Sequence, residues 1–211
     1  MDLKRQEENF KNHVATFVDY GNIKILDFKN PNSSNYRIRF LFEEDYYKLH
    51  ISGDLGELTA TNCSNMTYEK FSDFVNNIDY FKQKIDCHDR NIYIYDEDLA
   101  RKELEERAKD YDWLEDNDDY FWEEDEKLRL KYIIDDVLED FSSDNGIGPK
   151  GQEVLEDLES EAWEYVGDIG KRETGILDLY MLAFKLAKEQ LEKKSKVWCL
   201  GGTKKWHIEP I

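Results

Sequence analysis

The stretch Tyr36-Arg37-Ile38-Arg39-Phe40-Leu41-Phe42 decides the fold class of this 211-residue chain. Every second residue in it is aromatic or aliphatic, and a period of two is typical of a strand with one buried face. The same alternation returns at Tyr47, Leu49 and Ile51 after a short polar interval. The two segments therefore predict neighbouring antiparallel strands that share an apolar face.

Parity predicts the register of these two strands. If Leu41 lies opposite Tyr46, the alternating apolar residues of the two strands, such as Phe40 and Tyr47, fall on one face, whereas a slip by one residue mixes the faces. This register sets like charges directly opposite one another on the outer face, which is mildly unfavourable. We therefore expect that face to be solvated or to meet acid, and its basic residues are Arg37, Arg39, Lys48 and His50.

Outward from this pair, the first half of the chain predicts more strands and one helix. Alternating or β-branched segments at Asn22–Phe28, Glu57–Thr61 and Asn91–Tyr95 are typical of strands. Between them, Thr67–Ile85 starts with a capping residue and carries apolar residues at helical spacing. This half therefore predicts a small sheet packed on a helix.

The second half of the chain is predicted to be mainly helical. Asp96 is a favourable N-cap for a charged helix over about Glu97–Asp110. Amphipathic stripes follow over residues 130–141, 154–166 and 176–191, separated by glycine-containing breaks. We expect helices at all of these positions.

These elements predict an α+β fold in two parts. Residues 1–95 form the α+β sheet domain, a small antiparallel β-sheet packed on a helix. Residues 96–211 form an acidic, mainly helical region with a short C-terminal tail, which could add a short strand. The alternative is that the two parts form one continuous domain.

Negative charge is concentrated in the middle of the chain, which has a formal net charge of −19. Residues 1–95 hold 12 Lys/Arg and 15 Asp/Glu, residues 96–168 hold 8 and 28, and residues 169–211 hold 9 and 5. A surface that is acidic only for solubility does not need this asymmetry. The distribution favours an interaction surface for a basic partner.

The densest acidic segment runs from Asp110 to Glu126 and contains no Lys or Arg. Because aromatic residues interleave its carboxylates, we expect it to be ordered rather than a solvated tail. The predicted partner contacts are the carboxylates of Asp112, Glu115, Asp116, Asp118, Asp119, Glu123, Glu124 and Glu126. Candidate interface anchors are Trp113, Tyr120 and Trp122, whose alternative role is burial in the protein's own core.

No motif assigns a catalytic residue, a metal ligand or a cofactor. An EF-hand loop starting at Asp116 would place Phe121 where a glycine is needed. Glu57-Leu58-Thr59 lacks the lysine of a nuclease Glu-x-Lys motif, and Gly146–Gly151 lacks the Gly-Lys-Ser/Thr of a phosphate loop. The enzyme alternative is a hydrolase that holds Mg²⁺ with carboxylates and acts on nucleic acid or a nucleotide.

Cysteine usage and the N-terminus favour a cytoplasmic protein. Cys63, Cys87 and Cys199 contain no CxxC pair and suit no disulfide framework. The first residues are charged rather than apolar, and no segment reaches the roughly 18 apolar residues of a membrane span. We expect no membrane partner.

Phrases in the first half resemble proteins of phages and prophages of Gram-positive bacteria, over roughly residues 15–105. They are Asp19-Tyr20-Gly21-Asn22-Ile23-Lys24-Ile25-Leu26-Asp27-Phe28, Ile51-Ser52-Gly53-Asp54-Leu55-Gly56, Tyr80-Phe81 with Lys84-Ile85-Asp86-Cys87, and Tyr95-Asp96. This mobile-element family has no assigned activity, so no functional residue is carried over from it. Small acidic proteins in this context resemble anti-CRISPR and anti-restriction inhibitors.

The resulting hypothesis is a non-enzymatic inhibitor of a host defence protein. Its acidic band would occupy the basic nucleic-acid-binding surface of a CRISPR effector nuclease or a restriction enzyme. The alternatives are the Mg²⁺-dependent enzyme, and a phage interaction protein without nucleic-acid mimicry. Direct binding of nucleic acid is disfavoured by the charge, although the basic sheet face leaves a weak form of it open.

Overall fold

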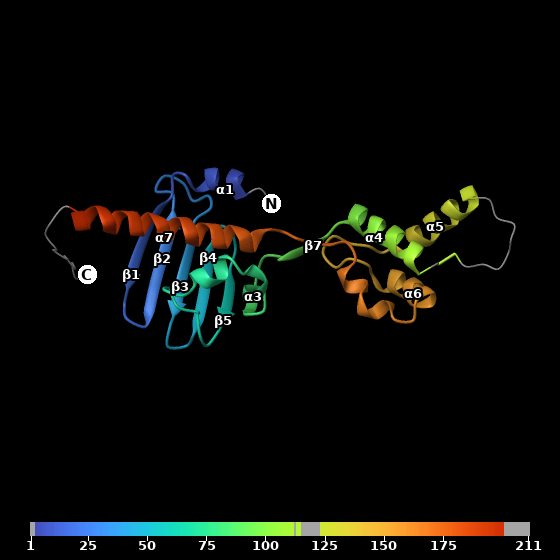
Figure 1. Cartoon of the computed structure of the whole chain (residues 1–211), viewed down its shortest axis with the longest axis horizontal. Coiled ribbons are helices and arrows are strands. Elements are labelled where there is room, and N and C mark those ends of the chain that lie inside the picture. The colour runs from blue at the N-terminus through green and yellow to red at the C-terminus, as the bar shows by residue number, and fades with distance from the viewer. Residues whose placement is uncertain (1–2, 112, 115–122, 201–211) are drawn as a thin grey trace. The chain divides into compact units, whose positions relative to one another are not determined.

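The computed structural model describes residues 3–111, 113–114 and 123–200, of which residues 3, 123–125 and 195–200 are described by their backbone only. The chain forms two compact units (Figure 1). Unit 1 comprises residues 1–91 together with residues 175–211, and unit 2 comprises residues 92–174. A six-stranded antiparallel sheet and several helices confirm the predicted α+β class.

Unit 1 is built on a sheet whose strands follow one another in chain order. The strands are β1 (Val14–Asp19), β2 (Ile23–Lys29), β3 (Ile38–Glu43), β4 (Lys48–Gly53), β5 (Leu58–Thr61) and β6 (Ile85–His88). The helices are α1 (Leu3–Phe10), α2 (Ser72–Val75), α3 (Ile78–Lys82) and α7 (Ile176–Leu200). Helix α7 crosses one face of the sheet and packs on β1, β2 and β3 (Figure 1).

The core of unit 1 lies between that sheet face and the helices. Phe40 and Phe42 on β3 are fully buried against Phe184 of α7 and Phe71, which precedes α2. Each such aromatic side chain contributes about 2–3 kcal/mol through burial. Tyr180 of α7 also lies in this core, where its hydroxyl donates to the Leu55 carbonyl at 3.0 Å and burial raises its pKa to about 12.

Helix α7 also covers part of the backbone of the edge strand β1. Gln190 accepts from the Ala15 amide at 2.6 Å and donates to the His13 carbonyl at 3.0 Å. Lys194 donates to the Ala15 carbonyl at 3.4 Å. An edge strand whose outward groups are already bonded is a poor template for pairing with another strand. Strand addition at this part of β1 is therefore blocked.

The predicted parity of β3 and β4 is confirmed, but the predicted register is wrong by four residues. Leu41 lies opposite His50 and Glu43 lies opposite Lys48. A shift of four keeps every side chain on its predicted face, so the apolar face is the one expected. Strand β3 extends to Glu43, and the β3–β4 turn comprises the next four residues, Glu44 to Tyr47. Within this turn the Tyr47 amide donates to the Glu44 carbonyl at 3.3 Å.

The observed register removes the basic outer face predicted from the sequence. Glu43 now lies opposite Lys48 and 3.4 Å from the His50 ring nitrogen. Arg39 lies opposite Asp27 on β2 and donates to both carboxylate oxygens, at 2.7 and 2.9 Å. Opposite charges therefore face one another on this side of the sheet, where like charges had been expected.

The prediction of a single helix over Thr67–Ile85 is also wrong. It is divided into α2 and α3 at Asn76 and Asn77. The Asn77 side chain accepts from the Tyr80 amide at 3.2 Å, so it caps a new helix instead of continuing the first. Ile85 then begins β6, while β1 and α1 were not predicted at all.

Unit 2 is mainly helical. Its elements are β7 (Tyr93–Tyr95), α4 (Glu97–Asp110), α5 (Glu123–Val137), α6 (Pro149–Leu158), short 3-10 helices at Ala162–Glu164 and Val166–Asp168, and β8 (Lys171–Glu173). The predicted helix start is confirmed, because Asp96 accepts from the Leu99 amide at 3.1 Å. Leu104, Val137 and Leu155, one from each long helix, meet in a core that belongs to unit 2 alone.

A two-stranded ribbon closes unit 2 on itself. Strand β7 pairs with β8, and Thr174 donates to the Ile92 carbonyl at 2.9 Å from its amide. The sequence division at residue 95 differs little from the observed boundary. The expected region 96–211, however, includes α7, which the structure places in unit 1 because its apolar stripe covers the sheet.

No helix within the described ranges is long and apolar enough to cross a membrane.

Because its ends are adjacent and its core is its own, unit 2 should fold alone. Residues 92–174 expressed as a separate chain should unfold in one cooperative transition, followed by circular dichroism against urea. A matched chain of residues 96–170, which lacks the ribbon, should unfold at a clearly lower urea concentration. Unfolded residues 92–174, or two chains of equal stability, would contradict this account of the ribbon.

Candidate functional site

The whole net charge of the protein belongs to unit 2. Residues 92–174 contain 10 Lys/Arg and 29 Asp/Glu, a net of −19, whereas the rest of the chain contains 19 of each and is neutral. The charge boundary therefore coincides with the structural boundary. A unit with this composition projects a negative field beyond its own surface, screened over about 8 Å at physiological salt.

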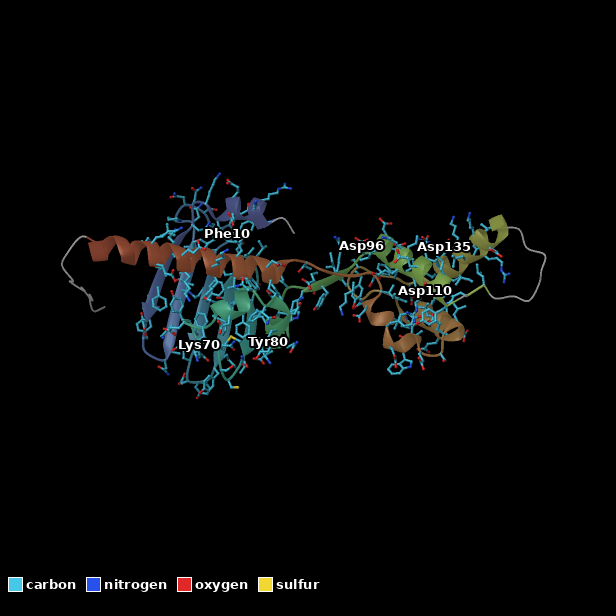
Figure 2. All side chains as sticks on the ribbon, viewed as in Figure 1. Phe10, Lys70, Tyr80, Asp96, Asp110 and Asp135 are labelled. Carbon is cyan, nitrogen blue, oxygen red and sulfur yellow. The ribbon has the colours of Figure 1, made fainter. Side chains whose placement is uncertain are left out.

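Local sequence explains why the carboxylates of α4 face outward. Its buried residues are Ala100, Leu104 and Ala108, which recur at helical spacing on one side. Glu97 and Asp98 occupy the first turn, where they favourably meet the positive end of the helix dipole. The remaining acidic residues of α4 lie on the solvent side or its margins, among them Asp110, which Figure 2 labels in unit 2.

Carboxylates are exposed on all three long helices of unit 2. They include Glu105 and Asp110 on α4, Glu126 and Asp136 on α5, and Glu153 and Asp157 on α6. Acidic side chains one helical turn apart lie about 5–6 Å from one another. The acidic surface is therefore broader than the segment 110–126 identified in the sequence.

Several basic residues of unit 2 are used internally. Arg101 of α4 donates to Asp135 of α5 at 2.7 Å, and Lys150 reaches Glu139 at 3.2 Å. Two more, both on β8, form ion pairs with acidic residues of the same unit, namely Lys171 with Asp168 and Arg172 with Asp96. The first of these pairs joins α4 to α5, and with 10 Lys/Arg against 29 Asp/Glu the carboxylates of unit 2 remain in large excess.

A connected polar cluster of unit 2 centres on Arg107. Its guanidinium binds the Glu159 carboxylate through both ends, at 2.6 to 3.1 Å, and lies over the rings of Tyr165 and Tyr111. Burial has the largest single effect and lowers the pKa of Arg107, but the hydrogen bonds to Glu159 and Tyr165 and the charges of these groups together raise it, so the net pKa is raised. Trp113 donates its indole N–H to the same carboxylate at 2.7 Å.

This cluster positions the start of the predicted acidic band. Trp113 is half-buried and packs against the core of unit 2 while it is bonded to Glu159. Its observed contacts are thus within its own protein, the alternative that the sequence left open. The pairing of Glu159 with Arg107 was missed because residues 52 positions apart carry no periodic signal.

The other predicted contacts are placed only in part. Glu126 is exposed on α5, and Glu123 and Glu124 form the start of that helix in their backbone. The remaining candidates lie outside the described residues, namely Asp112, Glu115, Asp116, Asp118, Asp119, Tyr120 and Trp122.

No cluster of three or more His, Cys, Asp or Glu side chains within the described ranges could hold a metal ion. A groove of about 490 Å³ lies between α1 and α7 in unit 1, and its lining includes the buried residues Phe10, His13 and Phe28. His13 donates from Nε2 to the Tyr36 carbonyl at 3.2 Å, and burial lowers its pKa from the usual 6.5. These contacts give His13 a structural role.

No family model, curated protein or solved structure matches this chain.

Glu159 should be the acidic residue of unit 2 whose loss destabilises it most clearly. Glu159→Ala leaves the Arg107 guanidinium and the Trp113 N–H without their acceptor, which should cost about 2–3 kcal/mol in urea unfolding. The matched control is Asp157→Ala, which removes the same charge from an exposed site on α6. Because that change relieves repulsion, it should be neutral or slightly stabilising. Equal effects of the two variants would contradict the role given to Glu159.

His13 should make unit 1 sensitive to mild acid. Because its folded-state pKa is lowered, protonation favours the unfolded chain, so stability is present above about pH 6.5 and falls as the pH drops below it. His13→Gln should reduce the loss of unfolding free energy between about pH 6.5 and 5.5. An unchanged profile in His13→Gln would exclude His13 as the cause.

Proposed function

We propose that this protein is a non-enzymatic inhibitor whose unit 2 binds the basic nucleic-acid-binding surface of a host defence protein. The supporting observation is the segregation of charge, with a net of −19 on unit 2 and zero on the rest of the chain. The expected targets are CRISPR effector nucleases and restriction enzymes. The acidic band of residues 112–126 and the exposed carboxylates of α4, α5 and α6 form the proposed contact surface.

The sign and placement of the charge support binding to a basic protein rather than to nucleic acid. Duplex DNA carries one negative charge per about 1.7 Å of its axis and is repelled by a surface of the same sign. A groove that evolved to bind those phosphates presents Lys and Arg side chains at a similar density. Carboxylates about 5–6 Å apart along a helix can pair with such side chains and exclude the nucleic acid.

Long-range attraction also gives the proposed complex its kinetic character. A strongly charged unit is steered toward an oppositely charged groove before contact, so association is fast at low salt. The two chain crossings at residues 91–92 and 174–175 attach this charged unit to a neutral one. Unit 1 therefore adds no net attraction or repulsion of its own to the approach.

The test is competition for a basic target. A panel of purified CRISPR effectors and restriction enzymes, each bound to fluorescent duplex DNA, is titrated with the full chain. At least one target should release its DNA, and the chain should bind it at least about tenfold more weakly at 200 mM than at 50 mM salt. A chain in which residues 92–174 are replaced by a short Gly-Ser linker should not compete.

A pair of matched variants separates local charge from total charge. Amide substitution of Glu105, Asp110, Glu126 and Asp136 should weaken binding at least about tenfold. The same substitution of four exposed acids in unit 1, Glu7, Glu8, Glu57 and Asp73, should have little effect. Salt-independent competition, or equal losses in both variants, would contradict the proposal and favour an enzyme or a different interaction protein.

A further inference from the structure

Three tyrosines at one end of the sheet are exposed and unpartnered. Tyr20, Tyr46 and Tyr47 are 67%, 72% and 46% exposed. In the part of the chain that the structure describes, no hydrogen bond, ring contact or cation–π contact involves any of their side chains. Exposed aromatic side chains in a group are a feature of protein interaction surfaces.

The sheet holds these tyrosines on two joined turns. Tyr20 lies in the β1–β2 turn, and Tyr46 and Tyr47 lie in the β3–β4 turn, at the lower end of the sheet in Figure 1. The Glu44 amide donates to the Asn22 carbonyl at 2.7 Å and so ties one turn to the other. We call these two turns the tyrosine tip.

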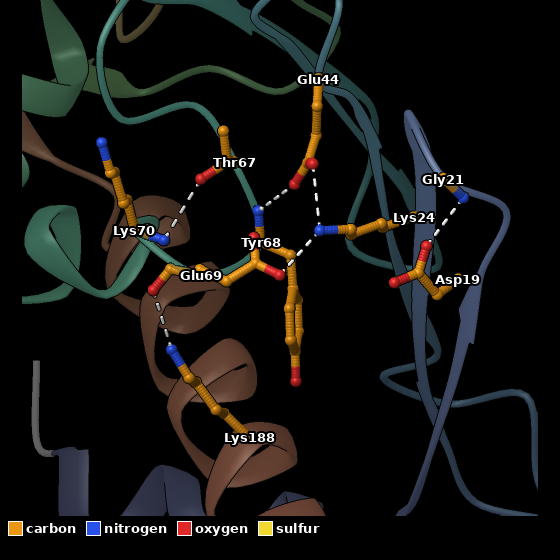
Figure 3. A network of polar contacts seen from close by, with 9 residues as sticks. All are labelled: Asp19, Gly21, Lys24, Glu44, Thr67, Tyr68, Glu69, Lys70 and Lys188. Carbon is orange, nitrogen blue, oxygen red and sulfur yellow. Dashed lines mark hydrogen bonds and ion pairs between the residues drawn. The ribbon is translucent and has the colours of Figure 1, made fainter.

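Carboxylates outnumber cations at the tyrosine tip, which carries Asp19, Glu43, Glu44 and Asp45 against Lys24 and Lys48. Glu44 is neutralised by Lys24, at 3.0 Å (Figure 3), and Glu43 lies opposite Lys48. Asp19 accepts the Gly21 amide at 2.8 Å, and among the described residues neither it nor Asp45 forms an ion pair. The tip therefore combines free tyrosine faces with a local negative charge.

The same molecule shows what tyrosine faces of this kind bind. Arg107 lies 4.2 Å from the centre of the Tyr111 ring and 3.3 Å from that of Tyr165. Lysine lies over three further tyrosines, Tyr80, Tyr93 and Tyr68, at 4.5, 4.7 and 5.6 Å. Among the described residues no such cation lies over the rings of the tip, although the neighbouring carboxylates would favour one.

We propose that the tyrosine tip is a second contact surface, which takes arginine side chains of the basic partner by stacking them on Tyr20, Tyr46 and Tyr47. The inference rests on the proposed function for the basic character of that partner. Arginine suits the tip better than lysine, because its planar guanidinium stacks on a ring while donating to a carboxylate such as Asp19 or Asp45. Nucleic acid also stacks on tyrosine, but its phosphates are repelled by these carboxylates.

The test titrates the isotope-labelled full chain with two blocked peptides, tetra-arginine and tetra-lysine, and follows backbone amides by NMR. At moderate salt the amides of Gly21, Asn22 and Tyr47 should respond to tetra-arginine with an affinity about two- to fivefold higher than to tetra-lysine. Amides of Glu153 and Asp157 on α6, a helix without aromatic residues, should respond to both peptides alike, since charge alone acts there.

Variants assign the response to the rings. The double change Tyr20→Ala and Tyr46→Ala should abolish the arginine preference at Gly21 and Asn22, whereas the matched double change to Phe should retain it. Tyr132→Ala, which removes another exposed tyrosine from unit 2, should leave the tip response unchanged. A tip that responds equally to both peptides, or keeps its preference in the alanine variant, overturns the inference.

The remaining outcomes separate this inference from the proposed function. If the tip amides do not respond and the unit 2 amides do, the inference about the tip is overturned and the proposed function is not. If the tip amides respond and the unit 2 amides do not, the proposed function is overturned, and the binding of arginine by the tip stands. Tip shifts that depend on protein concentration without peptide identify a contact between copies of this chain. Tip shifts produced by an octamer of thymidylate identify a nucleic-acid contact, and either result replaces the inference.

Discussion

The structure depends on the burial of one sheet face beneath α7. That helix follows unit 2 in the chain, yet its buried residues, among them Tyr180 and Phe184, complete a core whose remaining members come from the first 91 residues. Sheet and helix can meet only if everything between them is accommodated as an insertion. The ribbon of β7 and β8 satisfies this constraint, because it brings the two ends of the insertion together, with Thr174 hydrogen-bonded to Ile92. The segregation of charge follows the same boundary, so the insertion can be strongly acidic without placing its repelling carboxylates in the core of unit 1.

An insertion with a net charge of −19 must still fold against its own repulsion. Two of its ten basic residues oppose this repulsion at contacts between helices, whereas others, such as Lys102 and Lys109, lie on the exposed surface. Arg101 joins α4 to α5, and Arg107 joins α4 to the end of α6. The excess carboxylates are then left on the solvent side, where water and ions screen them. The internal pairing and the outward field are therefore two consequences of one distribution of charge.

Sequence reasoning worked where a short-range rule governs the structure. Asp96 and the helix after it follow from capping, and the apolar face of β3 follows from a period of two. Parity does not distinguish shifts by an even number of residues, so it gave the right face of β4 with a register wrong by four residues. The helix break at Asn77 is a local signal that was outweighed by the apolar spacing of Phe71, Phe74 and Phe81. The bond between Trp113 and Glu159 spans 46 positions and depends on how three helices pack, which no local pattern encodes.

The two proposed surfaces act on different terms of the binding free energy. The field of unit 2 reaches beyond contact distance and is weakened by salt, so it acts mainly on the association rate. Stacking of arginine on a tyrosine face acts only in contact, so the tyrosine tip acts mainly on dissociation and on the choice between arginine and lysine. Because both surfaces belong to one chain, engagement of the first raises the effective concentration of the second. A charged unit alone would bind any basic groove, and the neutral unit that carries the tip gives the pair a means of selecting among such grooves.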